Sequence, residues 1–186
     1  MHVLGLCGSL RRNSYNRRLL AAAAKELPDT ATFQSFDHLA AIPAYNEDLE
    51  VRDMPAAVGA LRRAIATASG VVIATPEYNA SVPGLLKNAI DWASRPYPNH
   101  ALRGKPVIVI GTSTSDFGAV VAQAELRRVL SAMGAAVLQA ELPVSKAKEA
   151  FTRDGRLANP LLREQLANMV LHLVNVAAVD GAHTCA

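Results

Sequence analysis

Two continuous runs of apolar, largely β-branched residues constrain the fold of this chain more than any other feature. Residues 71–75 read VVIAT and residues 107–110 read VIVI. A half-exposed strand alternates apolar and polar residues, whereas a strand buried on both faces is apolar throughout. Such strands occur almost only in parallel sheets that carry helices on both faces. The chain is therefore predicted to be an α/β protein.

Shorter signals around these two runs complete a β-α alternation. Three further strands are predicted at residues 3–7, 32–36 and 136–140. Helical spacing of apolar residues, with Pro or Gly near several ends, predicts helices at residues 14–26, 55–67, 83–94, 119–133 and 159–179. This alternation is typical of an open, doubly wound domain. Five parallel strands of this type favour the flavodoxin-like order 2-1-3-4-5.

Length and composition agree with one packed domain. The chain has 186 residues, of which 51% are hydrophobic and 19% charged, so disorder is excluded. We expect one domain over residues 1–179 and a disordered tail over residues 180–186. The net charge of +3 is dispersed and only 5% of residues are aromatic, which argues against nucleic-acid binding.

The sequence does not support a membrane-spanning, secreted, metal-binding or disulfide-bonded protein. No apolar run reaches the roughly 18 residues that a membrane span needs, and the N-terminus lacks the charged start of a signal peptide. The five histidines show no metal-ligand spacing. Cys7 and Cys185 do not indicate a disulfide framework. We therefore expect a cytoplasmic protein that has no metal site and does not associate with membranes.

The position of a ligand site follows from the predicted strand order. In a doubly wound sheet, ligands bind outside the carboxyl ends of the strands, at the point where the strand order reverses. For the order 2-1-3-4-5 this point lies between the first and third strands. The loops that follow the first, third and fourth strands are therefore the candidates.

The first of these loops, GSLRRNSYN at residues 8–16, predicts a phosphate site. Gly8 permits a tight turn, and the following helix offers free N–H groups and a partial positive charge. The loop also concentrates donors on four side chains, Ser9, Arg11, Ser14 and Asn16. The alternative, in which Ser14 is only a helix N-cap and Asn13 a turn residue, stays open.

Three better-known phosphate motifs do not match this loop. No Gly-Lys-Ser/Thr follows it, and Gly5 and Gly8 have the wrong spacing for a dinucleotide fingerprint. A cysteine phosphatase would carry an arginine six residues after Cys7, where this chain has Asn13. Without that bidentate partner for phosphate, Cys7 is interpreted as a small buried residue.

The other two loops suit a flat heterocycle. The loop after the third strand contains Pro76, Glu77, Tyr78 and Asn79. It offers successive backbone N–H groups after the proline, an acceptor on Glu77, an aromatic ring on Tyr78 and an amide on Asn79. GTSTSDFG, at residues 111–118, is small enough to let a ring approach the backbone. Alternatives are a plain ordered loop and a Ser/Thr turn with an N-cap at Asp116. The three loops contain little acid-base machinery, which favours chemistry supplied by a cofactor.

Three segments resemble the NADPH-dependent FMN reductase family, and within it most closely the bacterial chromate and quinone reductases. They are GSLRRNSYN, TPEYNASVPGLLKNAIDWASR and LRGKPVIVIGTS, and the likeness covers about residues 3–165. The resemblance implies a flavodoxin-like fold, non-covalently bound FMN, homodimers or homotetramers, and no catalytic side chain beyond the flavin. It further implies that Ser9, Arg11, Ser14 and Asn16 hold the FMN phosphate. Pro76, Glu77, Tyr78 and Asn79 would line the flavin ring and ribityl chain, and Ser113 would close the other side.

The third loop departs from the family pattern. Ser115 stands where the family commonly has glycine, Ala119 replaces the second of a pair of glycines, and Val121 replaces an arginine, whereas Gln123 is kept. These departures put in doubt the flavin and neighbour-subunit contacts that the family makes through this loop.

The resemblance implies an oxidoreductase that passes electrons from NADPH or NADH through FMN to quinones, chromate, azo compounds or free flavin. Two alternatives are a non-enzymatic electron carrier and a flavin-binding regulator without turnover. Flavodoxin-type carriers are usually acidic and lack the PEYN segment, which this basic chain has. Apolar residues around Trp92 and in the last predicted helix favour an oligomer. The sequence decides neither the physiological acceptor nor NADPH against NADH.

Overall fold

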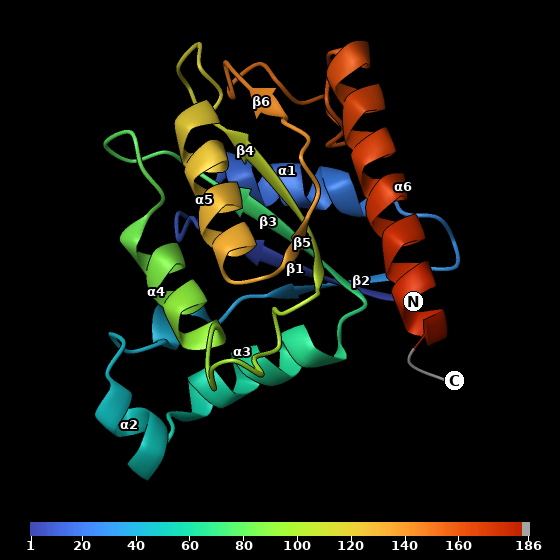
Figure 1. Ribbon diagram of the computed structural model, residues 1–186. Coiled ribbons are helices and arrows are strands. Elements are labelled where there is room, and N and C mark those ends of the chain that lie inside the picture. The colour runs from blue at the N-terminus through green and yellow to red at the C-terminus, as the bar shows by residue number, and fades with distance from the viewer. Residues whose placement is uncertain (184–186) are drawn as a thin grey trace.

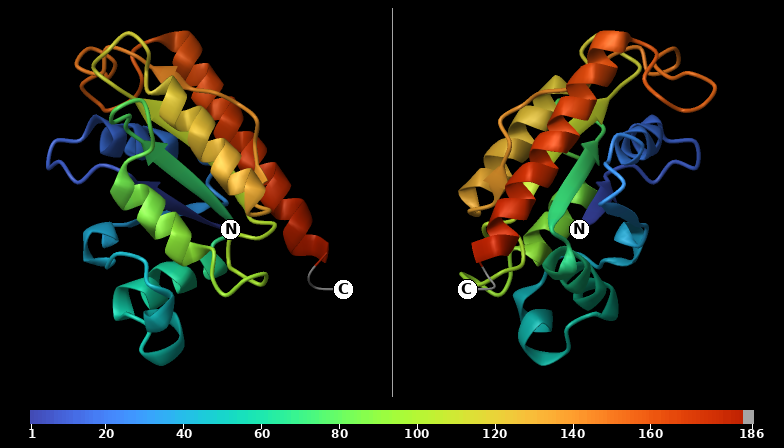
Figure 2. Two further views of the ribbon diagram at one scale, coloured as in Figure 1. Left: turned by 60° about the vertical axis from the view of Figure 1, so that its left-hand side comes forward. Right: turned by 90° about the vertical axis from the view of Figure 1, so that its right-hand side faces the viewer.

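The structure is a computed structural model that describes residues 1–183, and it consists of a parallel sheet between two layers of helices (Figure 1 and Figure 2). The strands are β1 (His2–Cys7), β2 (Thr32–Phe36), β3 (Gly70–Thr75), β4 (Pro106–Thr112), β5 (Ala136–Val137) and β6 (Pro143–Val144). They pair in parallel in the order β2-β1-β3-β4-β5, and β6 pairs with β4. The α/β class and the order 2-1-3-4-5 are confirmed.

The helices divide between the two faces of the sheet. They are α1 (Tyr15–Ala24), α2 (Glu47–Arg52), α3 (Ala56–Thr67), α4 (Gly84–Ala93), α5 (Val120–Ala132) and α6 (Pro160–His183), with a short 3-10 helix, η1 (Leu39–Ala41). Helices α1 and α6 cover one face, and α3, α4 and α5 cover the other (Figure 1). The sequence predicted no helix at α2 or η1, because they lie in a segment rich in Pro and polar residues.

The central strands are apolar throughout because each face of the sheet has its own core. In β3, Val71 and Ile73 pack into the cluster beneath α3, α4 and α5, whereas Val72 and Ala74 pack into the cluster beneath α1 and α6. All four residues are buried. Alternate residues therefore enter opposite cores, which explains why the run carries no polar positions.

The predicted strand at residues 136–140 is wrong beyond Val137. The N–H of Leu138 still donates to the carbonyl of Val107 in β4 at 2.9 Å. The chain then leaves the sheet and rejoins β4 at β6, where Gly111 pairs with Pro143. Side chains of α5 bind part of the backbone in between, at Ala140 and Leu142. Gln123 donates to the carbonyl of Leu142 at 3.2 Å and accepts from its N–H at 3.3 Å. These backbone groups therefore have hydrogen-bond partners outside the β ladder.

Two predictions about the helices change in the structure. Helix α6 continues to His183, so residues 180–183 belong to it, and residues 184–186 of the expected disordered tail lie outside the described residues. Trp92 is fully buried inside the chain, where its indole N–H donates to the carbonyl of Pro43 at 2.8 Å. Trp92 therefore offers no surface for a subunit contact. Within residues 1–183, no helix is both long and apolar enough to cross a membrane.

Candidate functional site

The carboxyl ends of β1, β3 and β4 lie side by side, and the loops that follow them enclose one pocket. The cavity measures about 130 Å³. Its walls are Ser9, Arg11, Ser14, Tyr15, Asn16, Pro76, Glu77, Tyr78, Thr112, Ser113 and Thr114, and we call it the three-loop pocket. All the site residues expected from the sequence line this pocket except Asn79. The strand order thus brings the three loops together as expected.

Helix α1 begins at the end of the first loop, residues 8–16. Ser14 is its N-cap, in extended conformation, and its hydroxyl accepts a hydrogen bond from the N–H of Arg17 at 3.2 Å. Ser9 is almost completely buried at 4% exposure, whereas Arg11 is exposed. The cap interpretation of Ser14 is therefore correct, and it coexists with a position in the pocket wall. The first turn of α1 presents further N–H groups and the positive end of the helix dipole at this point.

Asn16 connects the first loop to the third. Its side-chain nitrogen donates to the carbonyl of Thr112 at 2.9 Å, and its side-chain oxygen accepts from the N–H of Thr112 at 3.1 Å. All of these groups are buried. The amide is thus engaged on both sides, and Asn16 shapes the pocket by holding two loops together.

Gly8 allows the first loop to lie close to the second. A Cβ atom at Gly8 would lie 2.9 Å from a methyl carbon of Leu86 and 3.2 Å from the Cδ atom of Pro76. Both distances are shorter than ordinary van der Waals contact. The absence of a side chain at Gly8 therefore lets the first loop pack closely against the second loop and the start of α4.

The second loop forms a tight two-residue turn beyond the pocket wall. Tyr78 and Ser81 exchange two backbone hydrogen bonds of 3.1 Å, and the central residues Asn79 and Ala80 have φ angles of 54° and 56°. Left-handed backbone at both central positions defines a type I′ turn. Asn79 occupies this exposed turn rather than the pocket wall, and Tyr78 is 48% exposed at the mouth.

Glu77 has a partner that the sequence did not reveal. Its carboxylate accepts hydrogen bonds from the N–H groups of Val121 at 2.9 Å and Ala122 at 3.0 Å, at the start of α5. The N-cap residue of α5 is Ala119, with a φ of 60° and no side-chain acceptor. Glu77 therefore caps α5 from another loop. The alternative with Asp116 as N-cap is wrong.

The third loop is held by its own hydroxyls and by β6. The hydroxyls of Ser113 and Ser115 lie 2.7 Å apart, and the N–H of Ser113 donates to the carbonyl of Val144 at 3.2 Å. Gly118 has a φ of 58°, and a Cβ atom there would lie 2.4 Å from the carbonyl carbon of Pro143. Close packing on β6 thus requires glycine at this position.

The thiol of Cys7 is unsuited to nucleophilic chemistry. It is buried, its Sγ lies 3.7 Å from the carbonyl oxygen of Ser9, and burial raises its pKa. A nucleophilic cysteine needs a lowered pKa. Among residues 1–183, no three His, Cys, Asp or Glu side chains are grouped so as to hold a metal ion.

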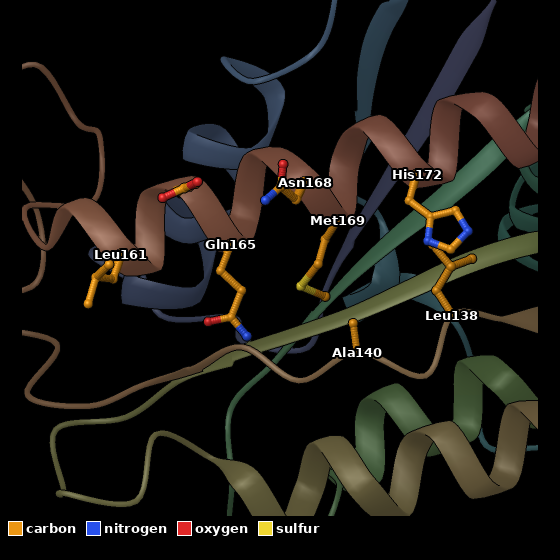
Figure 3. A pocket seen from close by; sticks show the side chains of 8 residues that line it. Leu138, Ala140, Leu161, Gln165, Asn168, Met169 and His172 are labelled. Carbon is orange, nitrogen blue, oxygen red and sulfur yellow. The ribbon is translucent and has the colours of Figure 1, made fainter.

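Three other hollows differ in their relation to the pocket. A hollow of about 280 Å³ shares Arg11 and Tyr78 with it, and one of about 370 Å³ shares Ser14 and Tyr15. A hollow of about 380 Å³ lies between α6 and the segment after β5, where Met169 points toward that segment (Figure 3). This last hollow contains none of the residues expected at the site, so its size does not identify it as the functional site.

Comparison with known proteins identifies the family. The sequence profile described as NADPH-dependent FMN reductase matches residues 1–149. An NAD(P)H-dependent FMN reductase of Pseudomonas aeruginosa is 41% identical over 174 residues, which cover 91% of this chain and 93% of that protein. A quinone reductase of Escherichia coli is 42% identical over 139 residues, covering 74% of this chain and 73% of that protein.

A solved structure supports the same family assignment. FerB, a flavoenzyme NAD(P)H:(acceptor) oxidoreductase from Paracoccus denitrificans, superimposes with a TM-score of 0.83 at 36% identity. The match covers 95% of this chain and 97% of FerB. The chain therefore belongs to the NADPH-dependent FMN reductase family and is an oxidoreductase, for which FMN is the expected cofactor and NAD(P)H the expected electron donor.

Proposed function

We propose that the three-loop pocket binds FMN non-covalently and that the protein passes electrons from NADPH or NADH to quinones. Chromate, azo compounds and free flavin are proposed as further acceptors. The observation that supports this most strongly is the meeting of the loops after β1, β3 and β4 in one pocket. The named relatives, a quinone reductase and an FMN reductase, support the acceptor class.

The donor set of the pocket fits a phosphate. Arg11 supplies a cation, Ser9 and Ser14 supply hydroxyls, and α1 supplies the positive end of its dipole. One oxygen of Glu77, the acidic side chain in the wall, accepts hydrogen bonds from the N–H groups at the positive end of the α5 dipole. The carboxylate therefore opposes a phosphate dianion less than a free one would.

In this proposal the side chains bind and orient, and the bound flavin supplies the electron transfer. Ser9, Arg11 and Ser14 would hold the phosphate at the β1 loop. The segment that contains Pro76, Glu77, Tyr78 and Asn79 would line the ring and the ribityl chain, with Ser113 on the opposite side. Asn16 would act by holding the first and third loops at a constant separation.

The decisive experiment is a spectrum followed by turnover. Purified protein loaded with FMN should show the two visible flavin absorption bands after removal of free FMN. NADPH or NADH should bleach these bands under anaerobic conditions, and added benzoquinone should restore them repeatedly. A carrier or a regulator would bind FMN and yet fail to oxidise NAD(P)H without a partner reductase. A protein that takes up no FMN on titration would refute the proposal.

We also propose a homodimer or homotetramer located in the cytoplasm. Three large apolar side chains of α6 are exposed, Leu161, Leu171 and Val179, and such exposure supports a subunit contact. The cytoplasmic location is proposed because the sequence has two cysteines and shows no disulfide framework. Light scattering at micromolar protein concentration tests the assembly, and a monomer there would contradict it.

A further inference from the structure

Two glutamates connect the second loop, which follows β3, with helix α5. One belongs to the loop and binds the helix, and the other belongs to the helix and binds the loop. Glu77 reaches from the loop to the N–H groups at the start of α5. Glu125, about one turn farther along α5, reaches back to the loop. Its carboxylate accepts from the hydroxyl of Ser81 at 2.8 Å and from the N–H of Val82 at 3.2 Å. We call this pair of glutamates and their contacts the glutamate clasp.

The glutamate clasp encloses the part of the second loop whose backbone conformation is least favourable. Asn79 and Ala80, between the two attachment points, both have left-handed backbone. Residues in such conformations persist only where the surrounding structure holds them. The exchanged hydrogen bonds of Tyr78 and Ser81 close the turn but do not orient it relative to the pocket. Glu77 and Glu125 provide that orientation, because both attach the loop to the same helix.

The surroundings of Glu125 keep its carboxylate charged. The Ser81 hydroxyl and the Val82 N–H lower its pKa, and the charges of Arg128 on α5 and Lys87 on α4 act in the same direction. Lys87 is itself paired with Asp91 at 2.7 Å. A charged acceptor makes stronger hydrogen bonds than a neutral one, so the contact with Ser81 is well suited to holding the loop.

We propose that Glu125 is a positioning residue for flavin binding. It does not line the three-loop pocket, but it fixes Ser81 and Val82 and thereby the placement of Tyr78 at the pocket mouth. This inference rests on the proposed FMN function. It assigns a role in the site to a residue of α5 that neither the loop motifs nor the pocket wall indicates.

The test is a double-mutant cycle read out on FMN. We would compare the wild type with Glu125→Ala, Glu125→Gln, Ser81→Ala and the double variant Glu125→Ala/Ser81→Ala. Glu164→Ala, on α6 and outside the three loops, is the matched control for removing a surface carboxylate. The dissociation constant for FMN is measured by quenching of flavin fluorescence. Visible circular dichroism at saturating FMN reports the surroundings of the bound ring.

We expect Glu125→Ala to raise the FMN dissociation constant about tenfold, as for the loss of one strong hydrogen bond. The visible dichroism of the bound flavin should change while the far-ultraviolet spectrum stays that of the wild type. Glu125→Gln, whose amide oxygen still accepts from Ser81, should restore much of the affinity and of the dichroism. The double variant should be no weaker than Glu125→Ala alone, because both changes remove the same contact.

Specific results would overturn the inference. One such result is that Glu125→Ala binds FMN with the same affinity, and gives the same flavin dichroism, as the Glu164→Ala control. The other is that the losses of FMN affinity caused by Glu125→Ala and Ser81→Ala add up in the double variant. If Glu125→Ala fails to fold, Ser81→Ala carries the same comparison, because it removes the donor to Glu125. An FMN affinity of Ser81→Ala equal to that of the Glu164→Ala control would then overturn the inference. Failure of the proposed function is seen separately, because then the wild type itself does not bind FMN.

Discussion

The side-chain amide of Asn16 pairs with both backbone groups of Thr112, through hydrogen bonds of 2.9 Å and 3.1 Å. Asn16 lies in the first turn of α1, and Thr112 is the last residue of β4. Strand β3 separates β1 from β4 in the sheet, so strand pairing does not connect these two segments. The amide makes that connection and thereby determines the width of the three-loop pocket.

Removal of this bridge should destabilise the protein. We expect Asn16→Ala to lower the free energy of unfolding by about 2 kcal/mol, because it leaves both backbone groups of buried Thr112 without their partner. Urea unfolding in the absence of FMN measures the change. Asn168→Ala, an exposed asparagine on α6, is the control and should change stability little. A loss for Asn16→Ala no larger than the control's would contradict this role.

Arg11 should bind the phosphate of FMN and not its ring. We expect Arg11→Ala to weaken FMN about ten- to hundredfold, the range for a charge-assisted hydrogen bond. Riboflavin, which lacks the phosphate, should bind both proteins with similar affinity. The neighbouring Arg12, which does not line the three-loop pocket, provides the control Arg12→Ala. Equal losses for FMN and riboflavin would show that Arg11 acts in another way.

The strained turn offers a stabilising change. Ala80 is exposed and has a φ of 56°, where a residue with a side chain is disfavoured and glycine is not. Ala80→Gly should raise the free energy of unfolding by about 0.5–1 kcal/mol. This is the balance of two effects: glycine relieves the strain in the folded protein, and it also gives the unfolded chain more conformational entropy. Ala80→Val should have the opposite effect. Denaturant unfolding compares the two, and a destabilised glycine variant would argue against a strained turn.

Glu125 should make stability depend on pH at the acid end. The hydrogen bonds from Ser81 and Val82 lower its pKa in the folded protein. A carboxyl with a lowered folded pKa stabilises the protein above its unfolded pKa, and this stabilisation is lost as the pH falls through the folded pKa. Below about pH 4.5, the ordinary pKa, wild type should therefore lose stability more steeply than Glu125→Gln. Parallel curves from urea unfolding across this range would contradict the prediction.

Cys7 should be dispensable for turnover. Burial raises the pKa of its thiol, which keeps it protonated at neutral pH. Cys7→Ala should therefore keep the rate of quinone reduction within about twofold of wild type, since electron transfer belongs to the bound flavin. NADPH oxidation with excess benzoquinone measures this rate. A variant that folds and binds FMN yet no longer turns over would assign chemistry to the thiol.

The predicted and observed elements show where sequence patterns are reliable. The ends of the two central strands, β3 and β4, were predicted to within one residue. Both strands are apolar throughout, a pattern typical of strands buried on both faces of a parallel sheet. The edge of the sheet was predicted less well. Residues 138–140 read like a strand, but the backbone of Leu138 makes the last hydrogen bond to β4 before β6, and Gln123 on α5 binds the backbone of Leu142 instead. That competition depends on a side chain far away in sequence.

The same distinction holds for the candidate site. The sequence alone determined which loops meet, because strand order follows from the β-α alternation and the carboxyl ends of parallel strands share one edge. Only the tertiary structure decided which side chains face the pocket and which hold its walls. Glu77 caps α5, Asn16 pairs with Thr112, and Glu125 holds Ser81. Each of these contacts joins residues more than forty positions apart, and no local pattern specifies such a pair.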